Sequence, residues 1–319
     1  MKKNLRILFV TPTYFPILGG NTITVDRIKH KLEKKGIEIK VVLGRDLTKN
    51  VIKQYNPTIV QGFHGIKSNI YPYISYLKEK DIPYVITLTG TCVNEDIKKV
   101  NFKKILKKVL ENAAAVVSFE KEPFTILKKH SIIVKQHKII PQGKPIFKGK
   151  VSIRKQLNIS QSIPLVLLVA GIRKIKDPLY AIQELSTLPV ALVILGEVIE
   201  PVYYNEIQNY ILKHNISNIY FAKVSHEFMG SVYEESNLII NTSNSESMST
   251  ALVEAISKNK PILASDIPGN LFLPRKYIYQ KKPGELKKRV EIFLKKPFSL
   301  NIKGKDIEAE KYLALYKSL

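Results

Sequence analysis

The segment of residues 237–269 constrains the fold of this chain more than any other. Its first five residues read NLIIN, a short β-branched run of the kind that forms a buried parallel strand. A polar loop follows, and Ser249 and Thr250 are both suitable N-caps for a helix. The segment therefore predicts a strand, then a loop, then a helix.

The end of this helix is also marked. Asn259 stands where a helix C-terminus needs a left-handed residue, and Asn is the usual substitute for Gly there. Pro261 stops the helix, and the apolar residues 262–264 begin the next strand. A strand–helix–strand unit of this kind predicts an α/β fold with a parallel sheet.

The start of the predicted helix is a suitable place for an anion such as a diphosphate. Backbone N–H groups of a first helical turn have no partner within the helix, and here they point beyond the strand ends. Glu246 in the loop could accept hydrogen bonds from sugar hydroxyls, and Glu254 could bind a ribose diol. The alternative is that both are ordinary solvated acids.

The spacing Glu246-x7-Glu254, followed by KPILASDIPG at residues 260–269, resembles the E-x7-E block of retaining glycosyltransferases with two Rossmann-like halves. More narrowly, it resembles glycosyltransferase family 4. The resemblance implies that Glu246 faces the donor sugar and that Glu254 holds the nucleotide ribose. Ser247 and Ser249 depart from the pattern, since the family usually has Gly at both positions.

Composition sets outer bounds on the fold. A chain of 319 residues with 45% apolar residues suits two domains of ordinary size. It has no apolar run of eighteen residues, and Arg6 interrupts the apolar start, so we expect a first strand there rather than a signal peptide or a membrane span. The single cysteine, Cys92, excludes an internal disulfide and suits a reducing, cytoplasmic compartment. Without a Cys/His cluster or an Asp-x-Asp pair, the sequence supports neither a metal nor another cofactor.

The net charge of +24 is unevenly placed. Residues 1–150 contain 29 basic and 11 acidic residues, and the remainder contains 22 and 16. This asymmetry indicates an anionic ligand or surface for the first half, or else a compositional bias towards Lys. A nucleic-acid-binding protein is a third hypothesis, but the chain lacks Trp and any nucleic-acid-binding motif, so no nucleic-acid partner is expected.

The first domain begins with a strand at residues 5–10 and a helix at residues 23–35. Between them, Gly19 and Gly20 could bring backbone N–H groups close to a phosphate or an acceptor. The loop lacks G-x-G-x-x-G, so a dinucleotide fingerprint is not supported. It does resemble the N-terminal glycine loop of the glycosyltransferase family.

Polar residues also follow two later strands of this domain. His64 comes after residues 57–63, at a strand end that we expect to face the ligand, although a lone His is more often structural. Thr89 and Gly90 follow residues 83–88, with Asn94 and Glu95 as candidates for the acceptor side. Many family members have His-Gly-x-Asp here, and this chain has Thr89-Gly90-Thr91-Cys92 instead.

The most basic segment is residues 98–110, which has apolar residues on one helical face. We expect a surface helix packed on the sheet. The alternative is an interfacial helix that touches anionic lipid at the inner membrane face.

The second domain is expected to open with the apolar strand at residues 164–170. Asp177 is a good N-cap and Pro178 a good first helical residue, so the loop between presents Arg173 and Lys176 beyond the strand ends. Arg suits bidentate phosphate contacts, and Lys supplies a point charge. The sequence GIRKIKDP resembles the family's G-R-x-x-x-K element, shortened by one residue, and a form found in relatives of animal glycosyltransferase 1 domain-containing proteins.

These observations and the resemblance predict two Rossmann-like domains that face a cleft, the GT-B arrangement. The expected bounds are 1–145 for an acceptor-side domain, 151–300 for a donor domain, and a last helix at 305–319 that packs back on the first. The expected catalytic residues are Glu246, Arg173 and Lys176. The expected donor-binding residues are Gly19, Gly20, Gly171, Arg173, Lys176, Ser247, Met248, Ser249, Thr250 and Glu254. Residues expected on the acceptor or sugar side are His64, Thr89, Gly90, Asn94 and Glu95.

The predicted activity is metal-independent, retaining transfer of a sugar, from a nucleotide-diphosphate sugar to a glycan, a lipid or another acceptor. A hexosyltransferase is expected. The alternative is a degenerate, non-catalytic relative that binds a nucleotide or a glycan.

Overall fold

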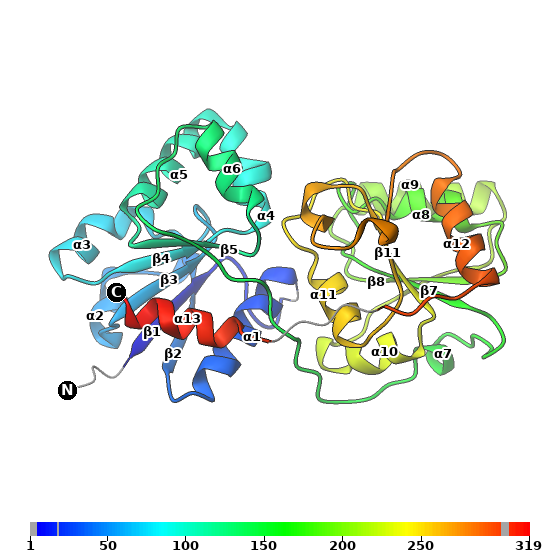
Figure 1. Ribbon diagram of the computed structural model, residues 1–319, viewed down its shortest axis with the longest axis horizontal. Helices are drawn as coiled ribbons and strands as arrows, with labels where there is room; N and C mark the ends of the chain where they lie inside the picture. Colours follow the sequence, from blue (N-terminus) through cyan, green and yellow to red (C-terminus); the bar gives the residue numbers. More distant parts are fainter. Residues whose placement is uncertain (1–4, 18, 301–305) are drawn as a thin grey trace. The chain divides into compact units, whose positions relative to one another are not determined.

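The computed structural model describes residues 5–17, 19–300 and 306–319. The chain divides into two compact units, which we call unit 1 (Met1–Gly143 with Lys305–Leu319) and unit 2 (Lys144–Gly304). Each described unit is an α/β body built on one six-stranded parallel sheet with helices on both faces (Figure 1). The predicted fold class is therefore confirmed for each half.

The sheet of unit 1 has the strand order β2-β1-β3-β4-β5-β6, and every neighbouring pair is parallel. The strands are β1 (Arg6–Thr11), β2 (Glu38–Leu43), β3 (Ile59–Phe63), β4 (Tyr84–Thr87), β5 (Ala115–Ser118) and β6 (His137–Ile139). The central strands are buried, as continuous β-branched runs predict. The first strand runs between β2 and β3, so the loops after β1 and β3 diverge at a topological switch point.

Helices cover both faces of this sheet. One face packs on α2 (Lys49–Tyr55), α3 (Ile74–Glu79), α4 (Gly90–Asn94), α5 (Val100–Asn112) and α6 (Glu122–Lys129). The other packs on α1 (Gly20–Glu33) and α13 (Glu308–Lys317). Figure 1 shows α13, the red helix at the C-terminus, beside α1. The last helix of the chain thus completes the core of unit 1.

The buried ion pair between Arg27 and Glu308 fixes α13 to α1. The guanidinium donates to both carboxylate oxygens, at 2.9 and 2.8 Å, and both side chains are almost fully buried. Deeper in the core, Tyr312 bonds Thr87 at 3.0 Å, and Tyr316 donates to Gln61 at 3.0 Å. These polar contacts give the helix one register on the sheet.

The sheet of unit 2 has the order β12-β11-β10-β7-β8-β9 and is also parallel throughout. Its strands are β7 (Leu165–Val169), β8 (Ala191–Leu195), β9 (Ile219–Ala222), β10 (Leu238–Asn241), β11 (Ile262–Ser265) and β12 (Ile278–Tyr279). The chain runs outward from β7 in one direction and from β10 in the other. The switch point of this sheet therefore lies between the carboxyl ends of β7 and β10.

Two groups of helices enclose the sheet of unit 2. One face packs on α8 (Pro178–Leu185), α9 (Pro201–Lys213) and α12 (Glu285–Lys295). The other packs on α7 (Ile153–Gln156), α10 (Met229–Glu235) and α11 (Thr250–Ser257), and the 3-10 turn η4 (His226–Phe228) precedes α10. Figure 1 shows the two groups on opposite sides of the strands.

Local capping signals in the sequence are confirmed. Asp177 accepts a hydrogen bond from the Tyr180 N–H as the N-cap of α8, with Pro178 as the first helical residue. Asn259 has a φ of 52° and Gly36 a φ of 78°, so both end their helices in the left-handed conformation. α11 begins at Thr250 with Ser249 as its N-cap residue, although the Ser249 side chain makes no capping bond.

One expected segment differs from the structure. Residues 90–94, expected as a loop, form the short helix α4, because the buried Cys92 and Val93 pack into the apolar core. The basic segment 281–296, by contrast, is mostly helical, as its sequence predicts: α12 begins at Glu285, after the left-handed Gly284 with a φ of 78°.

Candidate functional site

Two loops meet at the switch point of unit 2. The loop of residues 171–177 follows β7, and the loop of residues 242–249 follows β10. The Asn244 N–H donates to the Ile175 carbonyl at 2.8 Å, and the Thr242 hydroxyl donates to the Lys176 carbonyl at 2.8 Å. The loops are therefore fastened to each other by backbone atoms, so their side chains have defined positions.

Lys176 and Glu246 form an ion pair across these loops. The Lys176 ammonium donates to Glu246 Oε1, and the two side chains are only 16% and 11% exposed. The same oxygen accepts from the Ser243 hydroxyl at 2.8 Å and lies 3.4 Å from the Asn241 amide nitrogen. Several donors thus set the orientation of one carboxylate at the strand ends.

Arg173 lies in the same loop and is half-buried. Among the residues that the structure describes, its guanidinium has no hydrogen-bond or ion-pair partner. Because the neighbouring Lys176 already contacts a carboxylate, Arg173 is the cation of this loop that keeps its donors for a ligand. A planar guanidinium suits the oxygens of a diphosphate.

Lys281, in the segment that follows β12, bonds to both of these loops. Its ammonium donates to Asp177 Oδ2 at 2.5 Å and to Asn244 Oδ1 at 2.6 Å, so it contacts both loops. It also lies 5.0 Å from the centre of the Tyr180 ring. These contacts of Lys281 fix the position of Asp177, the N-cap residue that follows Lys176.

Glu254 is buried rather than solvated, since the residue is only 3% exposed. Its Oε2 accepts from the Tyr233 hydroxyl at 2.8 Å, and its Oε1 lies 2.6 Å from His226 Nε2. Burial first, and then the Glu254 charge, raise the pKa of Tyr233 well above its ordinary value, so the phenol remains a donor. A carboxylate offers about four lone-pair sites, of which these donors use two. The remaining two match the two hydroxyls of a ribose diol.

The other predicted donor residues of unit 2 surround this arrangement. Ser247 and Thr250 are half-buried, and Met248 and Ser249 are buried. Gly171 is half-buried and lies next to the Ile199 side chain. All of them belong to the two loops or to the first residue of α11. Their roles remain predictions, because no ligand defines the site.

Gly269 packs against the backbone of the loop that contains Glu246. A Cβ at this position would clash with the Glu246 carbonyl and lie 2.6 Å from the Ser247 carbonyl oxygen. We expect Gly269→Ala to cost about 1–3 kcal/mol through overpacking, seen as a lower thermal unfolding midpoint. Gly19→Ala is the control, because its Cβ would meet no atom within 4 Å, and its midpoint should not change. Equal midpoints for the two variants would contradict the close packing.

Unit 1 presents its own polar residues at its switch point. Gly19 and Gly20 are exposed at the start of α1, and the Gly19 φ of 174° is ordinary extended backbone. His64 directly follows β3 but is only 2% exposed. Its Nδ1 accepts from the Ile66 N–H at 3.1 Å and from the Lys67 N–H at 3.0 Å. His64 thus holds its own loop together, and a direct contact with an acceptor remains a prediction.

Burial first, and then Lys67, lower the pKa of His64 from 6.5 to about 3. The unfolded chain therefore binds a proton at this residue that the folded chain does not, and stability falls as the pH drops from about 6.5 towards 3. The slope is about 1.4 kcal/mol per pH unit. We expect His64→Asn to weaken this acid sensitivity, because Asn can accept the same bonds and tolerates the residue's φ of 121°. Unfolding midpoints between pH 7 and 4 test this, and the exposed His214→Asn should leave the slope unchanged.

The Cys92 side chain contacts the loop that follows His64 and the expected acceptor-side residue Thr89. Cys92 is fully buried, and its Sγ accepts from the Gly65 N–H at 3.0 Å and lies 3.7 Å from the Thr89 hydroxyl. Burial raises the pKa of its thiol. Cys92 therefore joins the loop after β3 to α4, which begins at Gly90. Asn94 is half-buried at the end of α4, and Glu95 is exposed.

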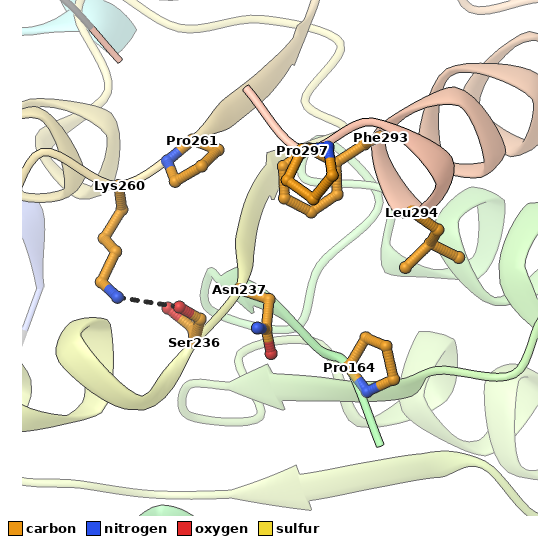
Figure 2. A pocket seen from close by; sticks show the side chains of 8 residues that line it. All are labelled: Pro164, Ser236, Asn237, Lys260, Pro261, Phe293, Leu294 and Pro297. Atoms are coloured by element: carbon orange, nitrogen blue, oxygen red, sulfur yellow. Dashed lines mark hydrogen bonds between the residues drawn. The ribbon is translucent and has the colours of Figure 1, made fainter. Parts of the chain in front are cut away.

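A pocket of about 290 Å³ lies at the opposite, amino-terminal edge of the sheet of unit 2. Figure 2 shows its lining side chains, with the Lys260 ammonium bonded to the Ser236 carbonyl at 3.0 Å. Most of the lining is Pro, Phe and Leu, and none of it comes from the two loops. It is not part of the site described above.

Within residues 5–17, 19–300 and 306–319, no group of three or more His, Cys, Asp or Glu side chains could hold a metal ion. No helix of this described part is long and apolar enough to cross a membrane.

The sequence did not indicate several residues of this arrangement. Neither Tyr233 nor Lys281 belongs to a motif that is recognisable in the sequence. His226, Ser243 and Asn241 had no assigned role either. They reach Glu254 or Glu246 through the packing of elements distant in sequence, which no local spacing shows.

Comparison with known proteins agrees with this geometry. Residues 150–307 match the family "Glycosyl transferases group 1". Glycosyltransferase 1 domain-containing protein 1 of Xenopus tropicalis is 28% identical over 270 residues, which cover 79% of this chain and 76% of that protein.

Solved structures share the fold. The sucrose-phosphate synthase of Thermosynechococcus elongatus superposes with a TM-score of 0.77 at 16% identity, covering 98% of this chain and 95% of that one. HepE of Anabaena, in complex with UDP and glucose, gives a TM-score of 0.74 at 15% identity, covering 92% and 90%. These likenesses confirm the predicted GT-B class of two Rossmann-like units.

Proposed function

Since residues 150–307 match the family "Glycosyl transferases group 1", we propose that this protein transfers a sugar from a nucleotide-diphosphate sugar to an acceptor, with retention of the anomeric configuration. The observation that carries the proposal is the pair of fastened loops at the switch point of unit 2. They bring Arg173 and the Lys176–Glu246 pair together where α11 begins. A hexose is the proposed donor sugar.

The cations act on the leaving diphosphate. Negative charge grows on the diphosphate as the bond to the sugar breaks, and fixed cations stabilise that charge without rearranging. Arg173 contributes its unused donors, and Lys176 is held by Glu246 at the same loops. The start of α11 adds the positive end of a helix dipole. The proposal gives this task to side chains and not to a metal ion, with no other cofactor.

Glu254 and Glu246 contact two different parts of the sugar-nucleotide substrate, the ribose and the sugar. Glu254 takes the ribose diol on the two lone-pair sites that Tyr233 and His226 leave over. Glu246, whose carboxylate is oriented by Lys176 and Ser243, faces the donor sugar. The complex of HepE with UDP and glucose supports a donor of this class.

We place the donor in unit 2 and the acceptor, a glycan, a lipid or another molecule, in unit 1. The acceptor-side candidates are the residues in the loops after β3 and β4, whereas Gly19 and Gly20, after β1, are proposed to contact the donor. Unit 1 also carries the exposed lysines of α5, opposite the face where Leu106, Val109 and Leu110 are buried. The protein would work in the cytoplasm, and this basic face could bring it to an anionic membrane. Co-sedimentation with phosphatidylserine vesicles, but not with phosphatidylcholine vesicles, would support that contact.

Product analysis tests the proposed reaction. The protein is incubated with UDP-, GDP-, ADP- and dTDP-hexoses and a panel of sugar and lipid acceptors, with and without EDTA. Proton NMR of the first product reports its anomeric configuration. We expect one donor to react, with retention and without loss in EDTA. An inverted product or an EDTA-sensitive rate would contradict the mechanism.

The alternative is a non-catalytic relative that binds a nucleotide or a glycan. The replacement of the family's usual Asp by Cys92 favours it. The burial of Cys92 against Gly65 shows instead that this position serves packing, so the replacement alone does not remove the donor site of unit 2. Nucleotide binding with no turnover of any donor would favour the alternative.

A further inference from the structure

Two donors hold the carboxylate of Glu254, and they differ in exposure. Tyr233 is fully buried, and its hydroxyl donates to Glu254 Oε2. The His226 ring is 20% exposed and lies with Nε2 2.6 Å from Oε1. Because Glu254 lies in α11 and His226 in η4, the contact joins two elements whose residues are 28 positions apart.

His226 itself is held from its other side by Phe147. The two ring centres are 5.6 Å apart, and Phe147 also lies 6.2 Å from the Tyr233 ring. The Lys148 and Gly149 N–H groups both donate to the Glu227 carbonyl, at 2.9 and 3.2 Å. The backbone beside Phe147 is therefore fastened to the backbone beside His226, and the imidazole is fixed before any ligand binds.

The last torsion of a Glu side chain is broad, so hydrogen-bond donors decide which way its carboxylate plane faces. With Tyr233 as the single donor, the carboxylate of Glu254 could still turn about its last side-chain torsion, and Oε1 would have no fixed position. With His226 in place, both oxygens are fixed, and the two remaining lone-pair directions are fixed with them. A ligand with two adjacent hydroxyls meets a carboxylate that is already oriented.

We propose that His226 is a positioning residue that orients Glu254 and thereby makes the site select nucleoside diphosphates with an intact ribose 2′,3′-diol over their 2′-deoxy forms. This inference rests on the proposed function, in which Glu254 holds the ribose. His226 acts through Glu254 and does not contact the reacting atoms. Phe147 keeps the imidazole in position.

The test compares dissociation constants for UDP, GDP, ADP and their 2′-deoxy counterparts by calorimetry, using the base that binds most tightly. We expect the parent protein to prefer the ribose form by about tenfold or more, the worth of one hydrogen bond to a charged group. His226→Phe keeps the ring against Phe147 but has no donor, and its preference should fall to about threefold or less. His226→Gln restores a side-chain N–H and should recover most of the preference. His214→Phe, at an exposed position in the same unit, is the matched control.

Glu254→Ala separates the two levels of the argument. If it abolishes the preference and His226→Phe does not, the ribose assignment survives and the inference about His226 is wrong. If Glu254→Ala leaves the preference intact, the ribose assignment itself fails. Thermal unfolding midpoints within about 3 °C of the parent show that each variant is folded. If His226→Phe falls outside that range, the comparison of His226→Gln with Glu254→Ala decides, and a preference in His226→Gln as low as in Glu254→Ala would overturn the inference.

Discussion

We expect that replacing Lys176 by Met lowers the rate of the proposed sugar transfer by about 10²- to 10³-fold. A fixed cation at a leaving group stabilises charge that develops only in the transition state, and removing one such group has an effect of this size. The substitution also takes away the ammonium that orients Glu246, so the sugar side loses a contact as well. Steady-state kinetics with the preferred donor give kcat and kcat/KM. We expect both to fall, because the interaction is strongest in the transition state.

Lys174→Met is the matched control for this prediction. Lys174 lies two residues away in the same loop, but its side chain is 70% exposed and its ammonium lies 3.8 Å from the exposed Glu206. We expect its rate to stay within about twofold of the parent, since exposed ion pairs contribute little. Similar losses in both variants would mean that loop charge as a whole, and not the place of Lys176, supports the reaction.

The second large effect concerns stability. Glu308→Ala should lower the free energy of unfolding of unit 1 by about 3–5 kcal/mol, because it leaves the buried Arg27 charge without its carboxylate. α13 then loses its main attachment to α1. Hydrogen exchange of α13 amides, together with urea unfolding followed by circular dichroism, measures the change. Exchange in unit 2 should remain as in the parent.

A double variant distinguishes charge from packing. Arg27→Met with Glu308→Leu fills the same place with apolar side chains, and we expect it to regain most of the lost stability. Glu310→Ala is the surface control, because its ion pair with Lys35 is 55% exposed on the Glu310 side. It should change the unfolding free energy by no more than about 0.5 kcal/mol. Equal losses for Glu308→Ala and Glu310→Ala would contradict the account of the buried pair.

The parallel strands and their order along the chain could be predicted because their evidence is local. Runs such as residues 164–170 are apolar on both faces, as a strand buried between two helix layers must be. Turn chemistry was equally local. Asp177 with Pro178, and Asn259 before Pro261, are recognisable as helix ends without a structure.

Other parts had no local signal. β12 has two residues, too few to show a period, and pairs only because β11 is beside it. α9 was not predicted, since the exposed apolar residues Val202 and Leu212 interrupt its pattern of one buried face. The burial of Glu254 could not be predicted either. It depends on Tyr233 and His226, which only the packing of α10 and η4 on α11 brings to its two oxygens.

The most direct measurement is the thermal shift of the protein with UDP, GDP, ADP and TDP, repeated with Glu254→Ala and Arg173→Ala. The account predicts that one diphosphate raises the unfolding midpoint of the parent protein and that both substitutions remove the rise. Stabilisation that survives both substitutions would place the nucleotide elsewhere. No stabilisation by any of the four would contradict a nucleotide-sugar donor altogether.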